Sequence, residues 1–253
     1  MDRDRVDFLI AGVQKGGTTA LHAQLQRHPA LGLPDEKELH FFDDEAQDWS
    51  APDLAAYHAR FAGLEGRARL GEATPIYLYW APALERIARY RADMRLVLVF
   101  RDPVERAWSH WRMEKARGFD AAPFAWAIRE GRARVDDPAS PGQHRVYSYV
   151  ERGFYAPQLA RAHALFGRER VLALRSEDLD ADPGATVAQV SRFLGVAPPE
   201  VPPPPLRANV GVSRDLGSRL TDEDRALLAG LYAEDLAAFG AASGLDVAGW
   251  ARG

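Results

Sequence analysis

The chain has 253 residues, a usual size for one α/β domain or two small ones. Its formal net charge of −4 gives no support to nucleic acid as a partner, and the absence of cysteine excludes disulfides, thiolate nucleophiles and cysteine-based zinc sites. No stretch approaches the ~20 apolar residues of a membrane span, and no apolar signal core follows the charged first residues. We therefore expect a cytoplasmic protein with one domain over residues 1–253.

Short apolar runs alternate with amphipathic segments along the chain. We expect strands at residues 6–10, 31–33, 69–72, 95–100 and 171–174, of which 95–100 (RLVLVF) is the clearest buried run. We expect helices at residues 18–28, 52–61, 82–90, 103–117, 186–194 and 222–239. Strands that alternate with helices predict an α/β fold with a central, mostly parallel sheet flanked by helices.

A glycine-rich turn follows the first expected strand and leads into the first expected helix. Residues 11–17 read AGVQKGG, and two threonines come next. Glycines let the backbone approach a ligand closely, and the N–H groups and dipole of a helix N-terminus favour phosphate. The run is not a Walker A loop, because Lys15 precedes Gly16 and Gly17 instead of lying directly before the hydroxyl residue. An ordinary tight turn with a threonine cap is the alternative.

A second group of polar residues follows the clearest buried strand. Residues 101–109 read RDPVERAWS. Ligands of open α/β sheets bind at the carboxyl ends of the strands, and arginine is a bidentate clamp for phosphate. Together with the glycine-rich turn, Arg101 and Ser109 therefore predict a ligand with two separated anionic groups. The alternative is that Arg101 and Asp102 only cap the strand and the next helix.

Five motifs, in this order, resemble those of sulfotransferases that use 3′-phosphoadenosine 5′-phosphosulfate (PAPS). Residues 7–20 (DFLIAGVQKGGTTA) are similar to the 5′-phosphosulfate loop of that family, and RDPVERAWS is similar to its 3′-phosphate segment. ELHFFD at 38–43 and GEATPIY at 71–77 resemble motifs of the heparan sulfate sulfotransferase branch. VLALRSEDLDADP at 171–183 resembles the family's late strand and turn. The resemblance implies a P-loop nucleotide-kinase-like sulfotransferase fold.

The resemblance also implies a role for each matching residue. Lys15 would bind the 5′-phosphate and the oxygen that bridges it to the sulfuryl group. Arg101 and Ser109 would hold the 3′-phosphate, and Glu38 matches the family's catalytic carboxylate. The loop around the 5′-phosphate would be lined by Gly16, Gly17, Thr18, Thr19 and Ala20. A lysine and a helix N-terminus can stabilise the charge on the departing phosphate, so no metal is required, and a carboxylate can accept the proton of the acceptor.

Several positions depart from that pattern or offer rivals. His40 is a rival base, or a histidine that orients the loop through a hydrogen bond. Ala73 stands where the heparan-type enzymes have a catalytic lysine. Lys37, beside Glu38, would supply the missing charge, unless it is a solvated surface lysine. The family's late lysine-rich loop is replaced by LRANVGVSR at 206–214, from which Arg207 or Arg214 would reach the 3′-phosphate.

The sequence thus predicts a sulfotransferase that moves a sulfuryl group from PAPS to a hydroxyl or amine by in-line displacement, with Glu38 as base. The acceptor would be a small molecule, a glycan or a lipid, and the nucleotide product would be adenosine 3′,5′-bisphosphate. Two alternatives belong to other classes. A P-loop-like kinase would need Mg²⁺, for which Asp102 is the obvious carboxylate after a strand, and a non-catalytic module would only bind the nucleotide.

Overall fold

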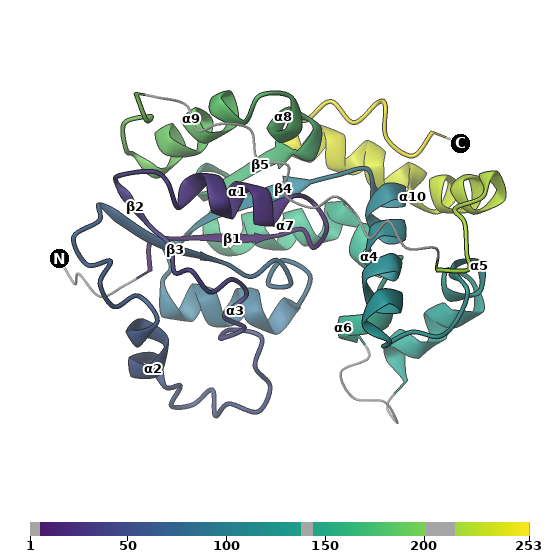
Figure 1. Ribbon diagram of the computed structural model, residues 1–253, viewed down its shortest axis with the longest axis horizontal. Helices are drawn as coiled ribbons and strands as arrows, with labels where there is room; N and C mark the ends of the chain where they lie inside the picture. The colour runs from purple at the N-terminus through teal and green to yellow at the C-terminus, as the bar shows by residue number, and fades with distance from the viewer. Residues whose placement is uncertain (1–5, 138–143, 201–215, 253) are drawn as a thin grey trace. The chain divides into compact units, whose positions relative to one another are not determined.

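A five-stranded sheet forms the centre of the protein, whose computed structural model describes residues 6–137, 144–200 and 216–252 (Figure 1). The strand order is β2-β3-β1-β4-β5, and each neighbouring pair is parallel. The strands are β1 (Phe8–Gly12), β2 (Leu31–Gly32), β3 (Arg69–Ala73), β4 (Arg95–Phe100) and β5 (Val171–Arg175). The expected parallel sheet and its five strands are confirmed, and β4 has the bounds expected from its apolar run.

Helices follow or precede each of these strands. They are α1 (Thr18–Leu25), α2 (Leu54–Ala59), α3 (Ala81–Tyr90), α4 (Pro103–Arg117), α5 (Phe124–Ala127), α6 (His144–Tyr147), α7 (Tyr155–Phe166), α8 (Ser176–Ala181), α9 (Pro183–Leu194) and α10 (Asp222–Ser243). Short 3₁₀ helices cover Glu130–Asp136, Glu151–Gly153 and Arg168–Arg170. The six expected helices are confirmed. Helix α9 begins earlier than expected, because Asp182 caps it and Pro183 occupies its first turn.

The chain divides into two compact units. The first comprises residues 1–100 and 160–208, and the second comprises residues 101–159 and 209–253. All five strands belong to the first unit. The single domain expected over residues 1–253 stays a prediction.

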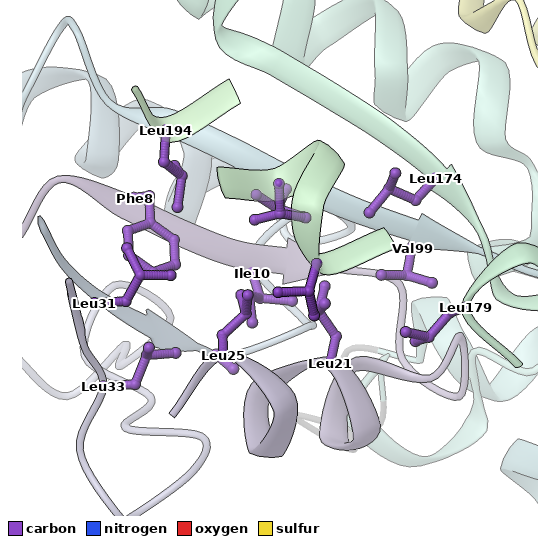
Figure 2. Packing of buried hydrophobic residues seen from close by; sticks show 14 residues of the cluster. Phe8, Ile10, Leu21, Leu25, Leu31, Leu33, Val99, Leu174, Leu179 and Leu194 are labelled. Carbon is purple, nitrogen blue, oxygen red and sulfur yellow. The ribbon is translucent and has the colours of Figure 1, made fainter. Parts of the chain in front are cut away.

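The hydrophobic core of the first unit lies between the sheet and helices α1 and α9. Phe8 and Ile10 of β1 point into this cluster together with Leu21 and Leu25 of α1 and Leu194 of α9 (Figure 2). All five side chains are buried, and burial of a side chain of this size contributes ~1.5–3 kcal/mol. Because β1 is central and anchored in this core, the backbone that leaves its carboxyl end starts from a fixed position.

Helix α3 covers the other face of the sheet (Figure 1). The connection through α1 carries the chain from β1 across β3 to β2, whereas the connection through α3 carries it from β3 across β1 to β4. Right-handed crossovers in opposite directions place their helices on opposite faces. The sheet is therefore covered on both sides, which agrees with the apolar character of its strands.

The second unit packs around α4. Trp111 of α4 is fully buried, and its ring stacks on that of Trp108 with centroids 5.1 Å apart. Helix α10 begins with a capping box in which the side chain of Thr221 accepts a hydrogen bond from the N–H of Asp224. Further along α10, the carboxylate of Asp235 accepts hydrogen bonds at the start of α7, including that of the Tyr155 N–H at 2.7 Å. These contacts hold the residues around the beginning of α4.

Gly71→Ala should destabilise the first unit. Gly71 of β3 pairs with Phe8 of β1, and a Cβ at this glycine would lie 2.4 Å from two carbons of the buried Phe8 ring. Overpacking of this kind costs ~1–3 kcal/mol in the free energy of unfolding, which urea denaturation would measure. Gly66→Ala is the matched control, because no described atom lies within 4 Å of its Cβ position. Equal losses in the two variants would contradict the packing argument.

Candidate active site

The glycine-rich turn connects β1 to α1 and lies against the end of β4. The N–H of Val13 donates to the carbonyl of Val99 at 3.0 Å, and the N–H of Gly16 donates to the carbonyl of Val13 at 2.9 Å. A Cβ on Gly16 would lie 2.1 Å from the carbonyl oxygen of Val99, so only glycine fits there. Lys15 and Gly17 both have left-handed backbones, with φ of 72° and 104°. The turn is therefore held in one conformation by backbone contacts.

The N-terminus of α1 carries no side-chain cap. Gly17 is the N-cap residue and supplies no side-chain cap, and the first turn contains no acidic residue. The first N–H groups of a helix have no intrahelical partner, and they lie at the positive end of the helix dipole. Thr18 is buried, Thr19 is exposed and Ala20 is half-buried in this turn. Together with the ammonium group of Lys15, these N–H groups can bind a phosphate.

Arg101 follows β4 directly in the chain, and its side chain is 36% exposed. Its guanidinium nitrogen Nη2 lies 3.9 Å from Oε2 of Glu105, and its carbonyl accepts a hydrogen bond from the hydroxyl of Tyr155 at 2.8 Å. Ser109 is half-buried on the second turn of α4. Within the described parts of the chain, the side chain of Arg101 makes this long ion pair, so its guanidinium group is a candidate for binding an anion.

Asp102 closes the N-terminus of α4. Its Oδ1 accepts hydrogen bonds from the N–H groups of Val104 at 2.8 Å and Glu105 at 3.2 Å, and its Oδ2 accepts one from the N–H of Ala251 at 2.7 Å. The helix-capping role is thus confirmed for Asp102. Elsewhere in the described parts of the chain, no three or more histidine, aspartate or glutamate side chains gather in a way that would hold a metal ion.

A chain of ion pairs runs through the segment that contains Glu38. The ammonium nitrogen of Lys37 lies 2.7 Å from Oε1 of Glu38, and Nε2 of His40 lies 3.6 Å from Oε2 of Glu38. On its other side, Nδ1 of His40 lies 3.0 Å from Oδ2 of the fully buried Asp43. Lys37 is only 15% exposed and Glu38 is 37% exposed. Lys37 is therefore not the solvated lysine that the sequence left as an alternative.

These contacts determine which groups carry charge. Hydrogen bonds with Asp43 and Glu38 raise the pKa of His40 from its ordinary 6.5 to about 9, although burial opposes the shift. Burial alone would raise the pKa of Glu38, but the hydrogen bond from His40 and the charge of Lys37 outweigh it and lower this pKa to about 2. Glu38 is ionised and His40 is protonated at neutral pH. This favours Glu38 as the base and His40 as the residue that orients it.

The backbone of the candidate residues is unusual. Among the described residues, only four that are not glycine have a positive φ: Lys15 at 72°, Glu38 at 65°, His40 at 53° and Ala251 at 48°. Such conformations cost energy for residues with a Cβ, and they persist where the surrounding structure holds them. Three of the four are the residues that the sequence marks as catalytic.

The end of β3 holds the Glu38 segment in place. The N–H of Glu38 donates to the carbonyl of Ala73 at 2.9 Å, and the N–H of Phe41 donates to the hydroxyl oxygen of Tyr77 at 3.1 Å. The ELHFFD and GEATPIY motifs therefore form one structural unit. This role of Tyr77 was not expected from the sequence, although the place of Tyr77 at the end of the second motif was a signal.

Glu72, which also lies on β3, is fully buried. Its Oε2 accepts a hydrogen bond from the hydroxyl of Thr74 at 2.8 Å. Burial raises its pKa to about 7, and the hydrogen bond from Thr74 limits the shift. The Glu72 carboxyl group is therefore only partly ionised at neutral pH, unlike that of Glu38.

Aromatic side chains surround the Glu38 segment. Phe41 is half-buried, and its ring stacks on that of Tyr57 with centroids 4.4 Å apart. Phe42 is fully buried, and its ring meets those of Phe41 and Tyr77 edge to face. Phe42 belongs to the core, whereas Phe41 can form part of a pocket wall.

Gly153 and Tyr155 lie just before and at the start of α7. Tyr155 is fully buried, and a Cβ on Gly153 would lie 2.5 Å from the hydroxyl oxygen of Tyr232, so Gly153 and Tyr155 are packing residues. Arg207 and Arg214, the candidates for the late 3′-phosphate contact, lie outside the described residues.

The comparison with family models agrees with the motifs. The model of the sulfotransferase domain matches residues 5–204. The chain belongs to this family. A solved sulfotransferase from Alicyclobacillus acidocaldarius is similar to it with a TM-score of 0.82 and 27% identity, over 98% of this chain and 99% of that one. This likeness confirms the sulfotransferase fold.

Curated sulfotransferases of the heparan sulfate branch are also similar to the chain. Heparan sulfate glucosamine 3-O-sulfotransferase 6 of Mus musculus is 34% identical over 199 residues, which cover 74% of this chain and 52% of that protein. Bifunctional heparan sulfate N-deacetylase/N-sulfotransferase 4 of Mus musculus is 26% identical and matches over 22% of its length. The chain thus spans about half the length of the first relative. Within the residues that the structure describes, every helix is too short or too polar to cross a membrane.

His40 should titrate near pH 9 in this sulfotransferase, which NMR of the ring protons would show. Because its pKa is raised above the unfolded value of 6.5, its stabilising effect is fully present below pH 6.5 and is lost as the pH rises through about 9. His40→Asn should therefore lower the free energy of unfolding more at about pH 6 than at about pH 10. The same loss at both values would show that His40 is not charged in the folded state.

Proposed function

We propose that the protein transfers a sulfuryl group from PAPS to a hydroxyl or amine of an acceptor. One observation carries this proposal. The anion-binding turn after β1 and the ionised Glu38, bonded to the end of β3, lie at the carboxyl edge of two neighbouring parallel strands. The phosphate of the donor can thus be bound, and the proton of the acceptor removed, at the same edge of one sheet.

In the donor half of the reaction, the bond between the sulfur and the bridging oxygen breaks. That oxygen keeps the electron pair, so negative charge grows on the 5′-phosphate of the departing adenosine 3′,5′-bisphosphate. The Lys15 ammonium group and the uncapped N–H groups of α1 would face this charge. Arg101 and Ser109 would bind the 3′-phosphate.

In the acceptor half, a lone pair of the acceptor oxygen or nitrogen forms the new bond to sulfur. The proton of the acceptor passes to the carboxylate of Glu38. Because the pKa of Glu38 is about 2, the carboxylate is always available near neutral pH but is a weak base. Proton transfer would therefore come late, when the new bond to sulfur has made the acceptor proton acidic.

The two rival classes receive less support. A Mg²⁺-dependent kinase would need Asp102 as a ligand, but both carboxylate oxygens of Asp102 are used in hydrogen bonds to backbone N–H groups. A module that only binds nucleotide would not require a carboxylate held ionised by two cations, as Glu38 is by Lys37 and His40. The family match also points to sulfuryl transfer.

For the acceptor, we favour a hydroxyl group on a sugar-like or apolar ring. Identity is higher to the relative named a 3-O-sulfotransferase, at 34%, than to the one named an N-sulfotransferase, at 26%. The half-buried Phe41, stacked on Tyr57, suits such a ring. A cytoplasmic location stays a prediction of the sequence.

Adenosine 3′,5′-bisphosphate should bind at least ~10-fold more tightly than adenosine 5′-phosphate, because a charge-assisted hydrogen bond contributes ~1.5–3 kcal/mol. Arg101→Ala should remove most of this preference, and calorimetry would measure both affinities. Arg117→Ala, at the exposed end of α4, is the control for loss of one positive charge. Equal affinity of the wild-type protein for the two nucleotides would overturn the 3′-phosphate assignment.

Glu38→Gln should lower turnover by ~10²–10⁴-fold, because it keeps the shape of the side chain but removes the base. Turnover would be measured with labelled PAPS and a panel of hydroxyl and amine acceptors, in the presence of EDTA. The affinity for adenosine 3′,5′-bisphosphate should hardly change and serves as the folding control. Activity that requires added Mg²⁺ would favour the kinase class.

His40→Ala should reduce turnover less than Glu38→Gln, since it misplaces the carboxylate without removing it. Near-normal turnover in Glu38→Gln beside a collapse in His40→Ala would assign the base to His40.

A further inference from the structure

We propose that Lys37 is a positioning residue for the transfer reaction: it fixes the ionised carboxylate of Glu38 in a segment that is hydrogen-bonded to the residue after α1, the helix that begins at the glycine-rich turn. This inference rests on the proposed function, which it deepens by adding a residue to the same site.

The first observation is the close pairing of Lys37 with Glu38. Their charged atoms are 2.7 Å apart, and the Lys37 side chain is only 15% exposed. Lysine side chains are seldom buried without a partner, because removing an ammonium group from water is costly. The neighbouring Asp35 and Glu36 are exposed, and Glu36 pairs with Arg60 instead. Lys37 is therefore the residue of this charged run that turns inward.

The second observation is the contact of the same segment with α1. The side chain of Gln26, the residue that follows α1, donates to the carbonyl of Pro34 at 3.1 Å and to Oδ1 of Asp35 at 3.2 Å. Burial, and after it the charge of Lys37, lower the pKa of His22 on α1 from 6.5 to about 4. His22 is therefore uncharged at neutral pH.

The spacing along α1 connects these contacts to the phosphate-binding turn. Thr18 and His22 are four residues apart and Gln26 is four further on, so they follow one face of the helix. Thr18 is the first residue of α1. The segment that carries Lys37 and Glu38 thus contacts the residue after a helix whose first turn lies at the proposed donor site.

The other groups around Glu38 do not replace this cation. His40 is the second cation that pairs with Glu38, but at the longer distance of 3.6 Å, and it is shared with Asp43. On the side of β3, the N–H of Glu38 donates to the carbonyl of Ala73. The titratable group of β3 that interacts with His40 is the carboxyl group of Glu72, which supplies no positive charge. Among the side chains that the structure describes, loss of Lys37 would leave His40, which is shared with Asp43, as the charged partner of this carboxylate.

Lys37→Met tests the proposal, because it keeps most of the side-chain volume and removes the charge. Carboxyl-carbon NMR of glutamate-labelled protein would follow the titration of Glu38, whose pKa should rise from about 2 by one unit or more. Lys37→Arg should restore most of the wild-type value. Lys115→Met, on α4, is the control for loss of one lysine elsewhere and should leave the pKa of Glu38 unchanged.

Kinetics supply the second readout. In Lys37→Met, kcat should fall ~10-fold or more through the misplaced base, while the affinity for adenosine 3′,5′-bisphosphate stays within about twofold. An unchanged Glu38 pKa together with an unchanged kcat would overturn the proposal. A loss of nucleotide affinity as large as that of Lys15→Ala would overturn it too, since Lys37 would then bind the donor. The NMR measurement does not require turnover and tests the pairing of Lys37 with Glu38 by itself. Failure of the wild-type protein to use PAPS would contradict the proposed function and not this pairing.

Discussion

The backbone pairing of β1 with β3 on one side and β4 on the other is the constraint on which the site depends. Pairing with β4 continues past the strand, because the N–H of Val13 still bonds to Val99 when the turn has begun. The turn is then pressed onto β4 so closely that Gly16 has no room for a side chain. On the other side, β3 ends at the carbonyl that receives the N–H of Glu38. One central strand thus sets the positions of both the glycine-rich turn and the segment that contains Glu38.

The two helix N-termini next to candidate anion sites are built in opposite ways. Helix α1 starts at a glycine and has no acid in its first turn, so neither an N-cap side chain nor a carboxylate of that turn competes with a ligand for its N–H groups. Helix α4 starts at Asp102, which occupies the first N–H groups, and Glu105 adds a second negative charge to the first turn. An anion beside α4 must be bound by side chains such as Arg101, whereas an anion beside α1 can be bound by the backbone itself.

Most of the fold could be predicted from the sequence, because local patterns determine it. The apolar run at β4, and Pro103 with Gly118 around α4, mark the bounds of their elements without any tertiary information. Helix α7 escaped prediction because Pro157 lies inside its sequence, although a proline is tolerated in the first turn and Asp235 of α10 binds the N–H groups there. Contacts between residues 80 positions apart leave no local pattern.

The candidate site was predictable in its members but not in its electrostatics. Lys15, Glu38 and Arg101 follow from motifs, yet the charge state of Glu38 depends on the balance between burial and two neighbouring cations. Whether Lys37 turns toward Glu38 or toward water is a matter of three-dimensional packing, which adjacency in the chain does not decide. The hydrogen bond from the N–H of Phe41 to the hydroxyl oxygen of Tyr77 likewise joins residues 36 positions apart.

The left-handed backbones at Lys15, Glu38 and His40 bear on how this protein could be stabilised by mutation. Glycine would adopt the same φ at each position without steric cost, so the strain of ~1–3 kcal/mol per residue is avoidable as far as folding is concerned. Glycine at these positions would relieve that strain, but it would also remove the ion pairs that Glu38 and His40 make. Stabilisation of this protein by mutation should leave these three positions untouched.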